Sequence, residues 1–115
     1  MFHGPQSELE IAQVIPAFSE HADELHQLCV RFHVLRLGLF GSAAAAHDFD
    51  ETSDLDFIVE FQQIPIADYA NAYFGLHESL EELFGRPVDL VVESAIKNPY
   101  FREAVEETRT SLYAA

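Results

Sequence analysis

The sequence predicts an α/β (α+β) fold, in which a small mixed β-sheet has helices packed on one face. Short apolar runs typical of strands alternate imperfectly with amphipathic segments, in the order helix, strand, strand, helix, strand, helix. A doubly wound parallel sheet would need a more regular alternation. With 115 residues, 49% of them hydrophobic, the chain is expected to form one domain, residues 1–115, around a single core.

The first half of the chain should supply a helix, a strand and a turn. Apolar residues recur at three- and four-residue steps from Phe18 to Phe32, which predicts one face of an amphipathic helix. Residues 34–40 are almost all apolar and predict a strand buried on both faces. The four alanines at 43–46 favour a short helix, and residues 47–53 are polar and acidic, as in a surface loop.

The next strand is predicted at 54–61, with Leu55, Phe57 and Val59 on one face and Asp54 and Asp56 on the other. A connector then leads to a second amphipathic helix.

That second helix should cover residues 69–83, with Asp68 as its N-cap and with Gly85 and Pro87 ending it. Residues 87–92 predict a third strand. Asn98 followed by proline predicts the N-cap and first position of a last helix, whose buried side would be Phe101, Ala104 and Val105. Residues 110–113 are expected to add an edge strand.

Charge narrows the range of partners. Twenty acidic and six basic side chains give a net charge of −14. This charge argues against binding to a nucleic-acid backbone and fits binding of divalent cations or of a basic protein. No apolar run is long enough for a membrane span, and no signal peptide is visible, so the cytoplasm is the expected location. The single cysteine, Cys29, lies in a helical apolar stripe and is expected to be buried. The sequence leaves open whether the chain forms a homo-oligomer.

Three carboxylates are the candidate metal ligands. Asp54 and Asp56 are two residues apart on a predicted strand, so they point to the same face and repel unless a cation lies between them. Asp89 interrupts an apolar run and would join that face if its strand lay beside theirs. Two simpler alternatives remain: an exposed acidic strand end, and an edge strand with Asp89 in water.

Gly41-Ser42 is the candidate phosphate-binding step. A glycine allows close approach to the backbone, and the Ser42 hydroxyl can donate a hydrogen bond to a phosphate oxygen. An ordinary turn is the alternative. Together with the carboxylates, this step indicates nucleotide chemistry.

The combination resembles the minimal nucleotidyltransferases of the DNA polymerase β-like superfamily. The resemblance rests on residues 39–42 (Leu-Phe-Gly-Ser), 53–59 (Ser-Asp-Leu-Asp-Phe-Ile-Val) and 88–91 (Val-Asp-Leu-Val), and extends to 98–100 and 112–113. It covers the chain from about Phe32 onward and implies the polymerase β-like nucleotidyltransferase fold.

The resemblance also implies a reaction. Asp54 and Asp56 would hold two Mg²⁺ ions, with Mn²⁺ as an alternative, on the triphosphate of ATP. Asp89 would help bind one ion and favour deprotonation of an acceptor hydroxyl, while Gly41 and Ser42 would hold the β- and γ-phosphates. The product would be an acceptor carrying AMP. Proteins resembling this family often act as antitoxins beside a HEPN-domain toxin, some by modifying a toxin tyrosine.

The sequence departs from the family pattern after Gly41-Ser42. Members usually carry an arginine there, whereas residues 43–46 are alanines and the following loop holds Asp48, Asp50 and Glu51. Candidate substitutes are Arg86, Lys97 and Arg102. These departures keep an alternative open: a nucleotidyltransferase-fold module with weak or no catalysis that neutralises a basic partner by contact.

Overall fold

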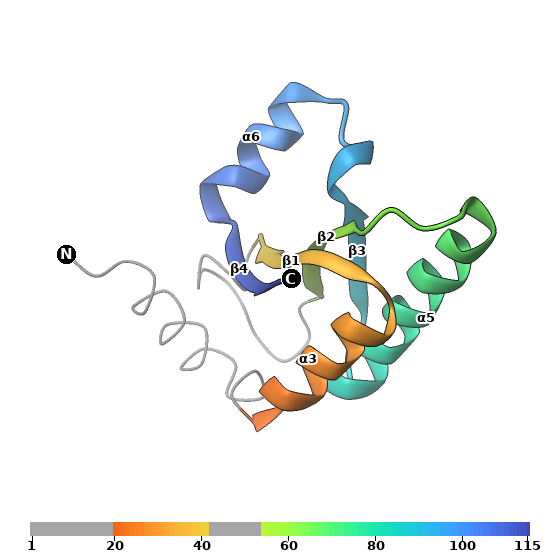
Figure 1. Ribbon diagram of the computed structural model, residues 1–115. Helices are drawn as coiled ribbons and strands as arrows, with labels where there is room; N and C mark the ends of the chain where they lie inside the picture. Colours follow the sequence, from red (N-terminus) through yellow and green to blue (C-terminus); the bar gives the residue numbers. More distant parts are fainter. Residues whose placement is uncertain (1–19, 42–53) are drawn as a thin grey trace.

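The computed structural model describes residues 20–41 and 54–115. In these residues, four strands form one sheet and three α-helices lie against it (Figure 1). The elements in chain order are α3 (Ala22–Arg31), β1 (Val34–Phe40), β2 (Leu55–Phe61), α5 (Ile66–Phe84), β3 (Val88–Val92), the short 3₁₀ helix η1 (Glu93–Ala95), α6 (Pro99–Thr108) and β4 (Thr110–Ala114).

The sheet is mixed, as the sequence predicts. Its strand order is β3-β2-β1-β4. β1 pairs antiparallel with β2 and with β4, whereas β2 and β3 run parallel. The parallel pair follows from α5, which carries the chain back along the sheet between β2 and β3.

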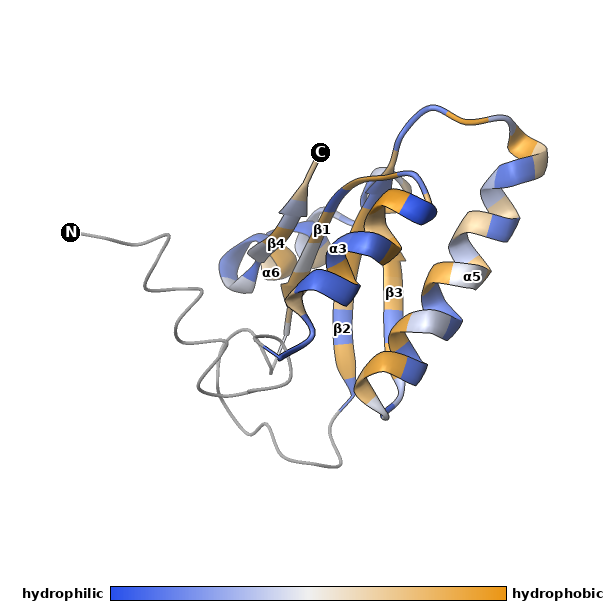
Figure 2. Cartoon of the chain, turned by 60° about the horizontal axis from the view of Figure 1, so that its bottom comes forward, coloured by the Kyte–Doolittle hydropathy of each residue, from blue (hydrophilic) through white to orange (hydrophobic). Residues whose placement is uncertain are grey.

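Helices α3 and α5 cover one face of the sheet (Figure 2). The main core lies between these two helices and the sheet, and it includes Leu25, Leu37, Phe57, Leu76 and Leu80. Cys29 is part of it with no exposed surface, and burial raises the pKa of its thiol to about 12. No helix in the described part of the chain has both the length and the apolar composition to cross a bilayer.

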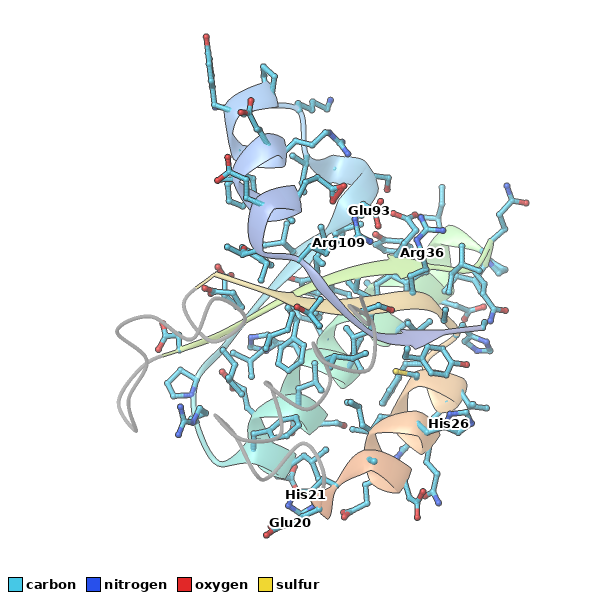
Figure 3. The ribbon with its side chains drawn as sticks, turned by 90° about the vertical axis from the view of Figure 1, so that its left-hand side faces the viewer. Glu20, His21, His26, Arg36, Glu93 and Arg109 are labelled. Carbon is cyan, nitrogen blue, oxygen red and sulfur yellow. The ribbon has the colours of Figure 1, made fainter. Side chains whose placement is uncertain are left out.

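Helix α6 packs on the opposite face, so the prediction of helices on one face is wrong for this helix. Figure 3 shows the sheet edge-on with α6 on one side and α3 and α5 on the other. A second core cluster joins Val105 of α6 to Phe40, Ile58 and Ile96. The carboxylate face of β2 therefore also carries apolar residues that need a cover. Of the three predicted buried residues of α6, only Val105 is buried, although the Phe101 ring meets that of Phe40 edge to face.

Two helix ends test the capping predictions. α5 starts at Ile66, so Asp68 lies inside its first turn, where a negative charge suits the helix dipole, and is not the N-cap. Gly85 ends the helix in the left-handed conformation, as predicted. The Asn98 side chain accepts hydrogen bonds from the backbone N–H groups of Tyr100 and Phe101, which confirms the predicted cap of α6. The expected helix at 43–46 and loop at 47–53 lie outside the described residues.

Candidate active site

The three predicted carboxylates lie at one end of the β2–β3 pair. Asp56 of β2 is the register partner of Asp89 of β3, and paired residues on parallel strands point to the same face. Asp54 directly precedes β2. In Figure 2 a hydrophilic band crosses β2 and β3 at the same level. The condition for Asp89 to share the face of Asp56 is therefore met, because β3 lies beside β2. The simpler alternative also describes the structure, since β3 is an edge strand and Asp89 is exposed.

The carboxylates influence one another electrostatically. The pKa of Asp56, which is half-buried, is raised by burial first, and then by the negative charges of Asp89 and Asp54. Within residues 20–41 and 54–115, no three His, Cys, Asp or Glu side chains converge closely enough to hold a metal ion as they stand. Asp54, Asp56 and Asp89 are neighbours, and their role as metal ligands stays a prediction.

Gly41 brings the end of β1 against Asp56. Its φ of +77° lies in the left-handed region, which favours glycine. A Cβ atom added at this position would lie 2.5 Å from Oδ2 of Asp56, well inside contact distance. The register agrees, because Phe40 pairs with Asp56. Ser42, the second residue of the predicted phosphate-binding step, lies outside the described residues.

Thr108 joins this site without having been predicted from the sequence. The backbone N–H of Gly41 donates a hydrogen bond of 2.9 Å to Oγ1 of Thr108, the last residue of α6. The two residues are 67 positions apart. No local spacing in the sequence could have linked them. The only available signal was a threonine two residues before the predicted edge strand.

The basic side chains on the α6 face belong largely to a separate ion-pair cluster. Arg36 and Arg109 both pair with Glu93, at 3.5 and 2.8 Å (Figure 3). The hydrogen bond from Arg109 is the largest cause of the lowered pKa of Glu93. These two arginines are therefore engaged with a carboxylate of their own, away from the Asp54 end of the sheet.

The three candidate substitutes for the missing arginine separate by position. Arg102 donates a 2.8 Å hydrogen bond to the carbonyl of Ile96, which holds it at the η1–α6 connection, where Lys97 also lies. Arg86 directly precedes Pro87, whose carbonyl accepts from the N–H of Leu55. Of the three, Arg86 thus has its backbone at the acidic end of the sheet.

A comparison with known families identifies this arrangement. Residues 18–112 match the nucleotidyltransferase domain family. The chain belongs to that family. The expectation of a nucleotidyltransferase enzyme is thereby confirmed, and so is the resemblance on which it rested.

Relatives of this nucleotidyltransferase have names that specify the transferred group. Protein adenylyltransferase MntA of Thermococcus cleftensis is 32% identical over 99 residues, covering 86% of this chain and 93% of that protein. A Methanocaldococcus jannaschii protein, provisionally named a protein adenylyltransferase, is 42% identical over 77 residues, covering 67% and 74% of the two chains. A solved structure provisionally described as a minimal nucleotidyltransferase is 32% identical, with a TM-score of 0.61, covering 80% of this chain and 89% of its own.

Two more distant structures share the fold of this nucleotidyltransferase. A toxin–antitoxin crystal structure with AMP-PNP has a TM-score of 0.62 at 18% identity, covering 82% of this chain and 73% of that one. A tri-AMPylated HEPN toxin of Shewanella oneidensis in complex with an MNT antitoxin has a TM-score of 0.57 at 17% identity, covering 84% and 72%. At these identities the likeness extends to the fold alone.

Proposed function

We propose that this nucleotidyltransferase transfers AMP from ATP to a hydroxyl group of a partner protein. The observation that carries the proposal is the pairing of Asp56 with Asp89, next to Asp54 and against the left-handed Gly41. In the reaction the acceptor hydroxyl would give up its proton to a carboxylate, its oxygen would bond to the α-phosphorus, the bond from that phosphorus to the bridging oxygen of the β-phosphate would break, and pyrophosphate would leave.

The carboxylates fit a hard divalent cation. Asp54, Asp56 and Asp89 would hold the two Mg²⁺ ions, or Mn²⁺ in their place, because carboxylate oxygens are the ligands such ions prefer. The pKa of Asp56 is raised by burial first and then by the negative charges of Asp89 and Asp54, and a bound cation would relieve that repulsion. Bound ions of this kind neutralise triphosphate charge and stabilise the entering and leaving oxygens. Asp89, exposed on the edge strand, lies where an incoming hydroxyl can approach.

The acceptor we propose is a hydroxyl of a HEPN-type toxin, with this chain as the antitoxin. The relatives named protein adenylyltransferases support a protein acceptor. The toxin–antitoxin structures of the same fold support a partner of this kind. A net charge of −14 adds an electrostatic reason, because it attracts a basic partner.

The test is transfer of label from ATP labelled at the α-phosphate, in the presence of Mg²⁺ and the protein encoded beside this one. We expect wild type to label the partner. Asp54→Asn should lower the rate on the order of 100-fold or more, because even partners outside a metal's ligand set can cost 10- to 100-fold. Asp68→Asn, an exposed carboxylate in the first turn of α5, is the matched control and should act like wild type.

The alternative is neutralisation by contact without transfer. It is favoured by the alanines at 43–46 and by the engagement of Arg36 and Arg109 with Glu93. On this alternative, wild type transfers no label, and Asp54→Asn binds and inhibits the partner as well as wild type does. That pair of results would reject the enzymatic proposal. If charge attraction drives the contact, binding of the partner should also weaken as the salt concentration is raised.

A further inference from the structure

We infer that Thr108 is a positioning residue, which fixes the turn at Gly41 and thereby sets where the triphosphate can lie. The inference deepens the proposed function and rests on it. It also changes the expected role of Gly41. This residue would matter for its backbone conformation and its lack of a side chain, and its N–H would not donate a hydrogen bond to a phosphate.

The Thr108 hydroxyl is placed between two backbone groups. Its oxygen accepts from the N–H of Gly41 at 2.9 Å, and its hydrogen can be donated to the carbonyl of Ala104, 3.5 Å away. A hydroxyl can donate once and accept twice, so both bonds can form together. The bond to Ala104 orients the oxygen toward Gly41.

Gly41 is held on two sides by this arrangement. Its N–H is used by Thr108, and its Cα faces Oδ2 of Asp56 so closely that a Cβ could not fit. An N–H that already donates to threonine is not available to a phosphate oxygen. The N–H of Gly41 would therefore not be one of the donors to the triphosphate.

Thr108 is itself firmly supported. Three residues earlier, Val105 is 1% exposed and packs in the cluster with Phe40 and Ile58. Two residues later, Thr110 begins β4 and pairs with Leu39 of β1. The hydroxyl thus extends from a backbone that is fixed on both sides, which is the condition for a positioning residue to be effective.

The experiment compares Thr108→Val, which keeps the shape and loses the hydroxyl, with Thr108→Ser, which keeps the hydroxyl. Thr110→Val is the control, because it makes the same change in β4 at a side chain that has no hydrogen bond to Gly41 or to another described residue. For Thr108→Val we expect kcat/KM for ATP to fall roughly three- to tenfold, mainly through KM, as for the loss of one hydrogen bond. Thr108→Ser and Thr110→Val should stay within about twofold of wild type.

A second measurement does not depend on transfer. Hydrogen exchange of the Gly41 amide, followed by NMR, should be several-fold faster in Thr108→Val and near wild type in Thr108→Ser. Unchanged Gly41 exchange in Thr108→Val overturns the inference, and so does a Ser variant as impaired as the Val variant. If wild type transfers no AMP but Gly41 exchange responds as expected, the proposed function fails while the role of Thr108 in the turn stands, and its effect on ATP affinity is then read from direct ATP binding.

Discussion

At the end of β1, the absence of one side chain determines how close the backbone comes to a carboxylate. Gly41 combines a left-handed φ with direct contact to Asp56, so two separate costs would follow from any substitution. Gly85 shares only the first property: its φ is +65°, and an added Cβ would meet nothing within 4 Å. The two glycines therefore allow the backbone cost and the contact cost to be separated.

Gly85→Ala should cost about 1 kcal/mol of unfolding free energy, from the left-handed conformation alone. Gly41→Ala should cost more, about 2 kcal/mol or above, and should also displace Asp56 and lower AMP transfer. Urea denaturation of the two variants measures the difference. Equal losses of stability with full transfer activity in Gly41→Ala would contradict the close contact.

Asp56 is expected to lower stability at neutral pH. Its folded-state pKa is raised above the ordinary value of 3.8, so the folded protein binds the proton more tightly than the unfolded chain. The contribution of this group is therefore most favourable below pH 3.8 and declines as the pH rises through the folded-state pKa. Asp56→Asn, which is neutral at every pH, should melt a few degrees higher than wild type at pH 7 without added metal.

Two further melting measurements test the expectation that the charge of Asp56 destabilises the folded protein. The advantage of Asp56→Asn should shrink as the pH is lowered from 7 toward 4. Mg²⁺ should raise the Tm of wild type and have little effect on Asp56→Asn, because a ligand that binds only the folded state stabilises it. A variant that melts below wild type at pH 7 would show that Asp56 is stabilised by its surroundings, contrary to the raised pKa.

Single residues differ in how far the sequence reveals them. The face shared by Asp54 and Asp56 follows from strand alternation, and Asp89 is conspicuous as a charge inside an apolar run. Thr108 meets Gly41 only because α6 returns across the sheet, which no local pattern encodes. The positions of Ser42 and of residues 43–53 lie outside the described structure, so their predicted roles remain predictions.

At the scale of elements, α5 protects the open edge of the sheet. β3 is an edge strand, and its outward backbone groups are bonded by side chains four residues apart on α5. The Tyr73 hydroxyl donates to the Leu90 carbonyl at 2.6 Å, and His77 Nε2 lies 2.8 Å from the Val88 carbonyl. Glu81 accepts from the Val88 N–H at 3.0 Å. The helix face that packs on the core thus also occupies the strand edge, which discourages pairing with another chain.

Tyr73→Phe should destabilise the protein by about 1 kcal/mol, because the Leu90 carbonyl loses its donor. Tyr69→Phe is the control, because the Tyr69 ring packs edge to face on Phe61 and, among the described residues, its hydroxyl does not bond the sheet edge. Denaturant midpoints of both variants give the comparison. A Tyr73 variant as stable as the Tyr69 variant would show that the edge bond contributes nothing.

Predictions for elements succeeded where periodicity is strong. β1 has the predicted bounds, β2 and β3 each begin one residue later than predicted, and α5 extends the predicted helix at both ends. The side on which α6 packs was missed. Of the three buried positions that its apolar pattern predicts, only Val105 is buried, and the partner surface is built from Phe40 and Ile58 on two separate strands. The side on which a helix packs is hard to predict from its own sequence when its packing partners come from distant parts of the chain.

At the scale of the whole molecule, the two faces of the sheet have different tasks. One carries α3, α5 and the main core, while the other carries the three carboxylates, the second apolar cluster and the Arg36–Glu93–Arg109 ion pairs. The fold class could be predicted because composition and element order are global properties. The site could be predicted only in part, because it draws on β1, β2, β3 and the end of α6.

The contact between Gly41 and Thr108 also has a consequence for the order of folding. Closing a loop of 67 residues costs entropy before any contact compensates for it, so local pairs such as β1 with β2 can form earlier. On the ribosome, the turn at Gly41 cannot be fixed until residue 108 has emerged. Newly made chains should therefore acquire a folded core first and this turn last, with an interval in which the protein is compact while the proposed triphosphate site is still incomplete.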